Sequence, residues 1–221
     1  MSFVKHAIFV SQDAPELTDY TAITEHILNR IDIEEILISR GVVDALDHSS
    51  PKFAIGGKLG LDCTGEEINE LGITQINDEE LLQKMQDISS EVTQIKQYFS
   101  HTKNPITVIK VSKTRSQREL FEALKPTFNH IKILIFVDDL KNDLDNKYML
   151  ICRVVNNIDS NRDLFFDKNT IALDATNKNA LDNYTRTWPD DVDCTREVLV
   201  SLQKRGIIKL NEKFEKEFQL T

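Results

Sequence analysis

The sequence predicts an α/β protein, with a mostly parallel sheet flanked by helices and built from two related β-α-β units. Two observations predict this class. Expected strands and helices alternate along the chain, and the strands are continuously apolar, as they are when helices cover both faces of a sheet. A third observation, a sequence pattern that recurs at a fixed offset, predicts the two units.

Size and composition narrow the function classes. The chain has 221 residues and a mass of 25.4 kDa, which suits one large domain or two small ones. A net charge of −9 argues against binding to nucleic acid, which normally needs a basic surface. No run of 18 apolar residues predicts a membrane span, and no signal peptide is visible. The three distant cysteines, without a CxxC motif, indicate a reduced, cytoplasmic chain.

The first unit is expected over residues 4–65. Residues 4–10 form a short apolar run typical of a buried strand. A helix capped by Thr18 or Asp19 follows, with one apolar face made of Tyr20, Ile23, Ile27 and Ile31. Residues 35–39 predict a second strand, and residues 41–65 predict a glycine-rich loop. Six of the seven glycines lie between Gly41 and Gly72, so unusual backbone is expected there.

The connecting segment, residues 66–130, is expected to be helix, strand and helix. Asn77 and Glu80 open a long predicted helix whose apolar residues are spaced 4-3-4-3-4: Leu81, Met85, Ile88, Val92, Ile95 and Phe99. This seam is either packed on the chain's own sheet or paired with a twin in a homodimer. A strand over 106–111 and a helix opened by Ser116 and ended near Pro126 complete the segment.

The second unit is expected over residues 131–205, and residues 206–221 form a C-terminal tail. Its elements are a strand over 131–137, a helix over 144–157, short strands at 164–166 and 171–173, and a helix over 193–205 that stops at Gly206. The first strands of the two units align at an offset of 127, which also aligns Asn29 and Asp32 with Asn156 and Asp159. Further on, LDxT at 61–64 aligns with LDxT at 173–176 at an offset of 112. The sequence therefore predicts a duplication, packed as one or two compact domains.

Four chemical interpretations have structural alternatives. Asp138 and Asp139 follow a strand, as in phospho-receiver domains, but we expect no Asp and Lys at the other strand ends that a receiver needs; helix capping is favoured. The run Gly56 to Gly60 either cradles a phosphate, with Lys58, or brings two chain segments close together. The five histidines show no zinc spacing, so they are expected to be surface or satisfied side chains. His48 and Ser49 beside Asp47 lack the spacing of a catalytic triad.

The segment LDHSSPKFAIGGKLGLDCT, residues 46–64, is a more specific signal. It resembles the C-terminal region of the UbiD family of carboxy-lyases, in which an LDxxSP element precedes G[SG]K[LM]G[IL]DAT. The second unit resembles the same family in ILIFVDD, NNIDSNRD, LDATNK and TRTWPDD, with Thr187 where Glu is usual. The resemblance covers residues 4–65 and 131–205 and is weak between them. The motifs are distributed over two units, and strand-end Asp residues occur only in the second, which indicates a divergent subgroup.

This resemblance implies a function for a parent protein. The resemblance implies an enzyme that removes CO2 from an aromatic or α,β-unsaturated acid with prenylated flavin mononucleotide and a divalent metal, manganese, and that acts in ubiquinone or menaquinone biosynthesis. The flavin and the catalytic residues belong to a preceding domain, which we expect as the partner of this region. The chain alone is then expected to hold no catalytic residue, metal or cofactor, and to cover the active site and support a homo-oligomer in the cytoplasm.

The resemblance also supplies the candidate residues near a substrate or cofactor. Lys58, Asp62 and Thr64 match one family string, and Asp174, Thr176 and Lys178 match the other. One alternative for Lys58 is that it neutralises a substrate carboxylate or a flavin phosphate. The other is that it has no such role. The Asp and Thr residues are favoured as fixing the backbone by local hydrogen bonds.

A second hypothesis is a free-standing, non-enzymatic α/β binding or assembly module descended from that family. The reading frame upstream of Met1 discriminates between the two, because a flavin-binding domain there excludes the free-standing module.

Overall fold

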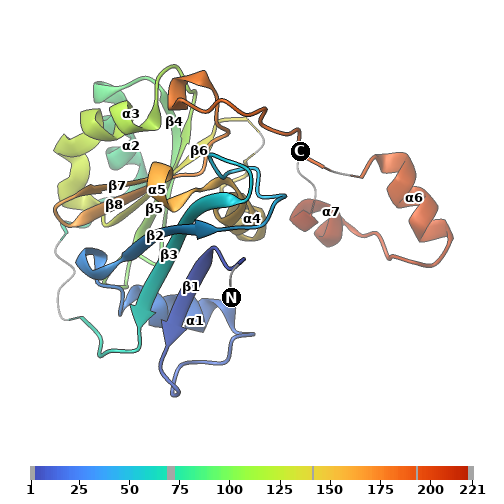
Figure 1. Cartoon of the computed structure of the whole chain (residues 1–221), viewed down its shortest axis with the longest axis horizontal. Helices are drawn as coiled ribbons and strands as arrows, with labels where there is room; N and C mark the ends of the chain where they lie inside the picture. The colour runs from blue at the N-terminus through green and yellow to red at the C-terminus, as the bar shows by residue number, and fades with distance from the viewer. Residues whose placement is uncertain (1–2, 69–72, 141, 193, 219–221) are drawn as a thin grey trace.

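The structure is a computed structural model that describes residues 3–68, 73–140, 142–192 and 194–218. Two sheets lie side by side, with helices around them (Figure 1). None of the described helices combines the length and apolar character that a membrane crossing requires. The α/β class is confirmed, but both sheets contain antiparallel pairs, so the prediction of a mostly parallel sheet is not confirmed.

The first sheet has three strands in the order β1-β3-β2. Strand β1 (His6–Val10) runs parallel to β3 (Ile55–Cys63), and β2 (Leu37–Val42) runs antiparallel to β3. Helix α1 (Tyr20–Leu28), capped by Asp19, and the 3-10 turn η1 (Ile33–Glu35) connect β1 to β2. The predicted glycine-rich loop is therefore wrong, because Gly56, Gly57 and Gly60 lie in the central strand.

The second sheet has five strands in the order β4-β5-β6-β8-β7. Strands β5 (Ile106–Val111), β6 (Ile133–Asp138) and β8 (Thr170–Asp174) are parallel, with β4 (Val92–Tyr98) and β7 (Leu164–Asp167) antiparallel at the two edges. Its helices are α2 (Asp78–Ile88), α3 (Gln117–Leu124), α4 (Lys147–Asn157) and α5 (Ser160–Asp163), with the 3-10 turns η2 (Lys125–His130) and η3 (Ala180–Asp182).

The predicted long helix after Asn77 is wrong in its second half. Helix α2 ends at Ile88, and the chain continues as strand β4. The register with β5 shifts between Val92 and Gln94, which leaves Thr93 as an extra residue. This bulge places Val92 and Ile95 on the same buried face at a spacing of three residues, which imitates helical periodicity. The predicted dimer seam through residues 81–99 is wrong for the same reason.

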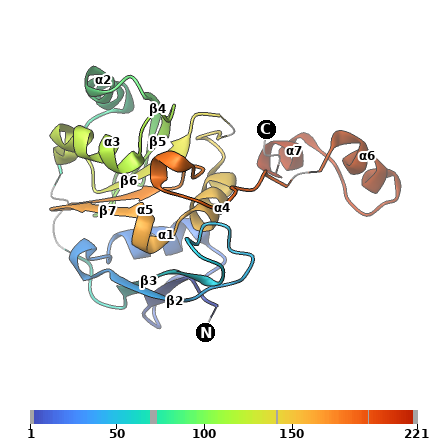
Figure 2. The ribbon, with the colours of Figure 1, turned by 45° about the horizontal axis from the view of Figure 1, so that its top comes forward.

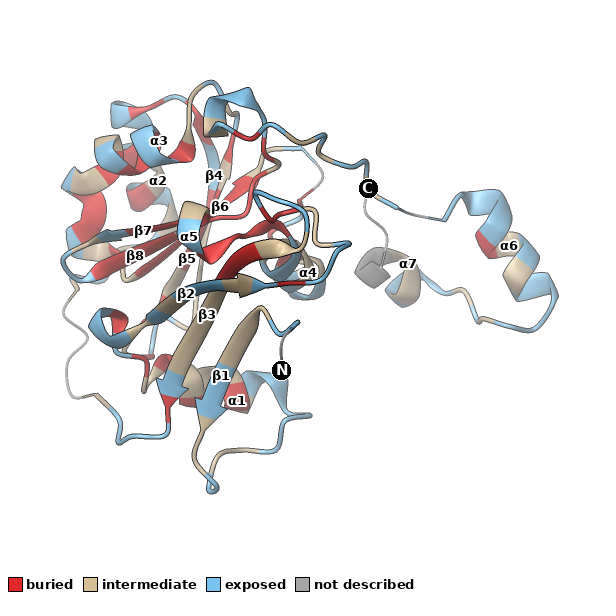
Figure 3. Cartoon of the chain, in the orientation of Figure 1, coloured by how far each residue is buried: buried red, intermediate tan, exposed pale blue. Residues whose placement is uncertain are grey.

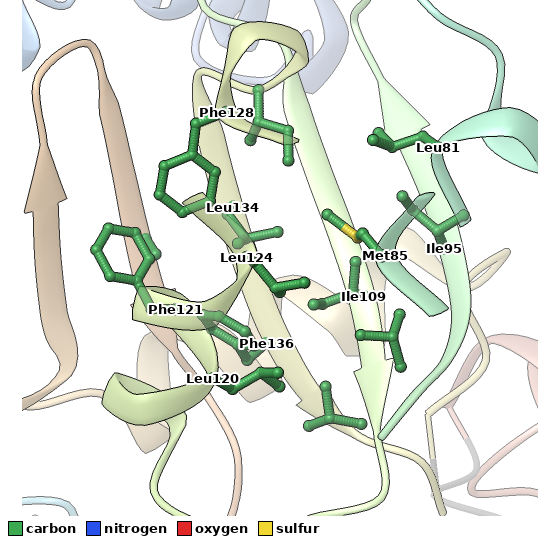
Figure 4. Packing of buried hydrophobic residues seen from close by; sticks show 14 of the residues in the cluster. Leu81, Met85, Ile95, Ile109, Leu120, Phe121, Leu124, Phe128, Leu134 and Phe136 are labelled. Carbon is green, nitrogen blue, oxygen red and sulfur yellow. The ribbon is translucent and has the colours of Figure 1, made fainter. Parts of the chain in front are cut away.

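Two apolar cores lie on the two faces of the five-stranded sheet. One core packs Leu81 and Met85 of α2 and Leu120, Phe121 and Leu124 of α3 against the sheet (Figure 4). The other core lies between the opposite face and the three-stranded sheet, with α1 and α4 also contributing side chains. Because this second core draws on both sheets, it joins the two predicted units through buried apolar surface.

The two predicted units share one order of elements. In each, a strand leads through helical turns to a hairpin whose second strand pairs in parallel with the first: β1-α1-η1-β2-β3 and β6-α4-α5-β7-β8. Asp32 caps η1 and Asp159 caps α5, as the aligned NxID motifs place them. The backbone therefore supports the duplication inferred from the sequence.

The C-terminal helices form an arm beside the two sheets, as Figure 2 shows. Helix α6 (Arg196–Lys204) ends as predicted, with Gly206 at a φ of +69°. Helix α7 (Glu212–Phe218), which the sequence analysis did not predict, follows, and Arg196 and Glu215 form an ion pair between the two helices.

The two units come into close contact where β3 passes α5. The backbone N–H of Gly57 donates a hydrogen bond to the Asp159 carboxylate, with 2.7 Å between nitrogen and oxygen. A Cβ on Gly57 would lie 2.4 Å from the Ser160 hydroxyl and 2.7 Å from the backbone nitrogen of Asn161. The structural alternative for this glycine run, a close approach of two chain segments, is thus confirmed, although it occurs in a strand.

We predict that Gly57→Ala lowers the free energy of unfolding by about 1–3 kcal/mol, because the added methyl meets backbone atoms of α5 that cannot move independently. Gly65→Ala is the matched control, since its Cβ would meet nothing within 4 Å, and we expect a change within about 0.5 kcal/mol. Urea unfolding measures both. Equal effects of the two variants would contradict the close approach.

Candidate functional site

The six residues predicted from the family resemblance fall into two groups in different sheets. Lys58 and Asp62 lie on β3, and Thr64 follows this strand. Asp174 ends β8, and Thr176 and Lys178 follow it. Asp62 and Thr64 are exposed, whereas Asp174, Thr176 and Lys178 are buried (Figure 3 shows burial along the chain).

The LDxT motifs make the same turn in both units. Asp62 Oδ1 accepts hydrogen bonds from the backbone N–H and the hydroxyl of Thr64, at 3.0 and 2.7 Å. Asp174 Oδ1 accepts the equivalent pair from Thr176, at 3.0 and 2.5 Å. These bonds lower the pKa of the exposed Asp62 carboxyl. Local side-chain-to-backbone bonding, the favoured alternative for these four residues, is what the geometry contains.

Lys58 lies on β3 next to the start of the chain. Its Nζ donates to the backbone oxygen of Val4 at 2.7 Å. The aliphatic part of its side chain lies over Gly41 of β2, where a Cβ would come within 2.9 Å of Cε. The lysine thus lies across the three-stranded sheet and contacts its neighbours there.

Lys178 has a fully buried side chain within a network of charges. Its Nζ donates to the backbone oxygens of Asp174 and Thr176, at 2.7 and 2.6 Å, and pairs with the Asp174 carboxylate at 3.2 Å. Asp163 lies 3.9 Å away and forms a two-bond pair with Arg162. Burial alone would raise the pKa of Asp174, but the nearby Lys178 and Lys113 ammonium groups hold it below its usual value.

The LDHSS part of the family-like segment contacts the second unit, so it lies at the joint between the two units. His48 Nε2 lies 3.2 Å from the Asn157 side-chain oxygen, and the Ser49 hydroxyl donates to the backbone oxygen of Ile158 at 3.0 Å. From the TRTWPDD segment, Arg186 donates to the backbone oxygen of Ser50 at 2.9 Å, and the ring of Trp188 packs edge-on against His48. The two most family-specific segments thus meet each other.

A partly buried charge cluster lies beside this joint. Lys5 forms an ion pair with Asp47 at 3.0 Å and a hydrogen bond with the Ser49 hydroxyl. Ser49 has no exposed surface, so it cannot act as a nucleophile on a bound substrate. His6 lies close enough to Lys5, Asp47 and Asp159 for their charges to act on it.

Two histidines depart from the sequence expectation. Within the described residues, Nε2 of the partly buried His6 and of the buried His26 lies in the interior without a hydrogen-bond partner, so this nitrogen is neither at the surface nor satisfied. Burial lowers the pKa of His6 from 6.5 to about 4. The apolar runs around both residues hid this in the sequence.

The sequence analysis disfavoured a phospho-receiver because it expected no Asp and Lys at the other strand ends, and this expectation is wrong. An Asp does lie at the end of a neighbouring parallel strand, Asp174 of β8, and Lys113 follows β5 on the other side of β6. The sequence analysis missed both because it did not predict strand order. Asp174 is 2% exposed and paired with Lys178, however, so it is not accessible to a phosphodonor.

The described residues offer no site for a flavin phosphate or a metal ion. Gly57 and Gly60 pack against Ser160 and Leu37, and the Lys58 ammonium is bonded to Val4, so β3 forms no open cradle for a phosphate. The described ranges contain no group of three or more His, Cys, Asp or Glu side chains placed to hold a metal ion. Neither a flavin phosphate nor a metal ion therefore fits the described residues of this chain.

We predict an acid-sensitive contribution to stability from His6. Its pKa of about 4 in the folded chain lies below the value of about 6.5 in the unfolded chain, so only the unfolded chain binds this proton between the two. Stability from this group is complete above pH 6.5 and is lost as the pH falls towards 4, by at most about 1.4 kcal/mol per pH unit.

His6→Gln should flatten this part of the stability profile, measured by urea unfolding at pH 4–7. The matched control is His101→Gln, whose side chain is 67% exposed, and its profile should follow the wild type closely. A wild-type slope retained in His6→Gln would contradict the assignment.

Comparisons with known proteins show what parts of this chain are similar to. Residues 1–63 match the family model of the 3-octaprenyl-4-hydroxybenzoate carboxy-lyase C-terminal domain. Two relatives, uncharacterised proteins of Helicobacter pylori strains 26695 and J99, are 48% identical over 222 residues. The match covers all of this chain and 36% of each relative, so the chain spans about a third of their length.

Solved structures with similarity to this chain include a decarboxylase and a UbiD-class enzyme. The vanillic acid decarboxylase of Sedimentibacter hydroxybenzoicus, in an open form, has a TM-score of 0.45 and 13% identity, covering 57% of this chain and 31% of that one. An evolved dimeric form of the UbiD-class enzyme HmfF from Pelotomaculum thermopropionicum, in complex with prenylated FMN, has a TM-score of 0.41 and 16% identity, covering 69% and 41%.

The family match includes β1, α1, β2 and β3, and it contains most of the segment, residues 46–64, on which the sequence resemblance rests. Residues 1–63 are therefore similar to the C-terminal domain of the UbiD carboxy-lyases.

Proposed function

We propose that this chain is the C-terminal α/β region of a UbiD-type decarboxylase that removes CO2 from an aromatic or α,β-unsaturated acid. The observation that carries the proposal is the family match over residues 1–63. The relatives that extend well beyond the matched region are consistent with further domains in such a protein. In the proposed enzyme, a preceding domain binds prenylated FMN and a divalent metal, and the flavin serves as the electron sink for decarboxylation.

We further propose that this region covers the active site, contributes to a homo-oligomer and serves quinone biosynthesis. Exposed apolar side chains support a contact role. Phe9 of β1 and Leu37 of β2 are 53% and 66% exposed on the three-stranded sheet, and Val198 of α6 is 45% exposed on the C-terminal arm. Such side chains gain free energy when a second surface covers them. A cover of this kind would exclude water from the reaction and gate product release.

The roles of the six family-matched residues are part of this proposal. We assign Asp62, Thr64, Asp174 and Thr176 to fixing the turns after β3 and β8, supported by their paired hydrogen bonds. We assign Lys178 to neutralising Asp174 and Asp163, supported by its complete burial. Lys58, which is not fully buried, is the residue of this set that we place nearest to a carboxylate or phosphate contributed by the rest of the enzyme.

The natural gene product that contains this sequence tests the decarboxylase assignment. Reconstituted with prenylated FMN and Mn²⁺, it should release CO2 from at least one acid in a panel of aromatic and α,β-unsaturated acids, measured by product analysis. The 221-residue chain alone, treated identically, is the control and should be inactive. No CO2 release by the natural protein would contradict the function, and robust turnover by the chain alone would contradict the assignment of catalysis to another domain.

The two lysines should differ in their contribution to stability. We predict that Lys178→Met lowers the free energy of unfolding by about 3–5 kcal/mol, because Asp174 loses its ion-pair partner inside the protein. Lys58→Met should cost less than about 1 kcal/mol, since it removes partly exposed contacts. Denaturant unfolding at pH 7 measures both, and a similar loss in the two variants would contradict the assigned roles.

A further inference from the structure

A cavity of about 430 Å³ opens at the carboxyl ends of the parallel strands of the five-stranded sheet. Val111 ends β5, Asp138 ends β6, and the loops after both strands contribute to its lining together with Asn177 beyond β8. The volume lies within the range of small-molecule sites, which is about 300–1,000 Å³. None of the six residues matched to the family lines this cavity, although Thr176 accepts a hydrogen bond from its lining residue Lys113.

The cavity lies at a topological switch point. The loop after β5 leads to α3, whose Leu120 and Phe121 pack in the core on one face of the sheet. The loop after β6 leads to α4, whose Leu150 packs in the core on the opposite face. The two loops therefore diverge, and in open α/β sheets the crevice between such loops, outside the carboxyl ends of the strands, is where ligands bind.

The cations in the lining are already neutralised. Lys113 Nζ donates to the Thr176 hydroxyl at 2.9 Å, to the backbone oxygen of Asn177 at 3.0 Å and to the Asp182 carboxylate at 2.6 Å. Arg153 forms a two-bond pair with Asp191, at 2.7 and 3.3 Å. An anionic ligand would therefore have to compete with established ion pairs.

The strand-end carboxylates have acceptor capacity left over. Asp138 Oδ2 accepts the backbone N–H of Asn177 at 2.9 Å, and Asp139 Oδ1 accepts the Thr93 hydroxyl at 2.6 Å. Among the described residues, no donor is bonded to the second oxygen of either carboxylate. Burial raises the pKa of Asp138, as expected for a carboxylate with few compensating donors.

These features select a class of ligand. A phosphate or carboxylate would meet two carboxylates that have acceptor capacity left over, whereas hydroxyl and ammonium groups can both donate to them. A metal ion would lack a third carboxylate or imidazole ligand in the described part of the chain. A neutral ligand with two adjacent hydroxyl groups avoids these conflicts and donates to both carboxylates, while Val111 and Leu140 offer apolar contact.

We propose that the cavity between the ends of β5 and β6 binds a neutral small molecule that presents two adjacent hydroxyl groups, as the ribose of a nucleoside does. Asp138 and Asp139 accept hydrogen bonds from the two hydroxyls, and the switch point between α3 and α4 provides the cavity. This site is independent of the proposed decarboxylase function.

The test is a titration of the ¹⁵N-labelled chain with adenosine, guanosine, cytidine and uridine up to 10 mM, followed by NMR. At least one nucleoside should give saturable shifts at Ser112, Lys113 and Asn177. Its 2′-deoxy form should bind about tenfold more weakly, because one hydroxyl bonded to a carboxylate is lost. Asp139→Asn should weaken binding by a similar factor, whereas Glu79→Gln, which removes an exposed carboxylate from α2, should not.

Unfolding midpoints of both variants establish that they fold. Four outcomes would overturn the proposal: no saturable shift with any ribonucleoside, equal binding of the 2′-deoxy form, unchanged binding by a folded Asp139→Asn variant, or saturation of the same residues by inorganic phosphate, methylammonium or Mg²⁺ in place of the nucleosides.

Discussion

The contact between β3 and α5 is the constraint on which the arrangement of the two units depends. A strand can approach a helix this closely only where it lacks side chains, and Gly56 and Gly57 provide that gap. Asp159 occupies the space, accepts the Gly57 N–H and at the same time caps α5 through Asn161. One carboxylate thus orders a helix start in the second unit and binds the central strand of the first.

This constraint gives the family-like sequence segments a structural meaning. In the first unit, LDHSS from the connection between β2 and β3 and GGK of β3 meet NNIDSN and TRTW of the second unit. The amino-acid types on the two sides of such a contact depend on each other, because a substitution on either side leaves a buried polar group without its hydrogen bond. A specific string in a sequence can therefore mark a joint between units as readily as a catalytic loop.

The sequence was informative wherever local chemistry decided the structure. The strand over Ile106–Val111, the Ser116–Glu119 capping box and the glycine end of α6 follow from side chains within a few residues. The duplicated motifs also predicted equivalent turns.

Prediction failed where packing between segments far apart in the sequence determined the structure. The bulge at Thr93 gave a strand the spacing of a helix, and the glycines of β3 look like a loop until α5 is placed against them. Strand order was not predictable, so neither the cavity beside Asp138 nor the position of Asp174 next to it could be foreseen.

The edges of the two sheets differ in how they are guarded against further strand pairing. In the five-stranded sheet, β7 is only four residues long, and β4 carries a bulge and Lys96, both of which discourage intermolecular pairing. In the other sheet, α5 contacts β2, and Asn161 donates to its Ser39 carbonyl. Strand β1 has a continuous register and exposes Ile8 and Phe9. Aggregation of this chain in isolation would therefore be expected to begin at β1, where neither a charge, a bulge nor a covering helix protects the strand.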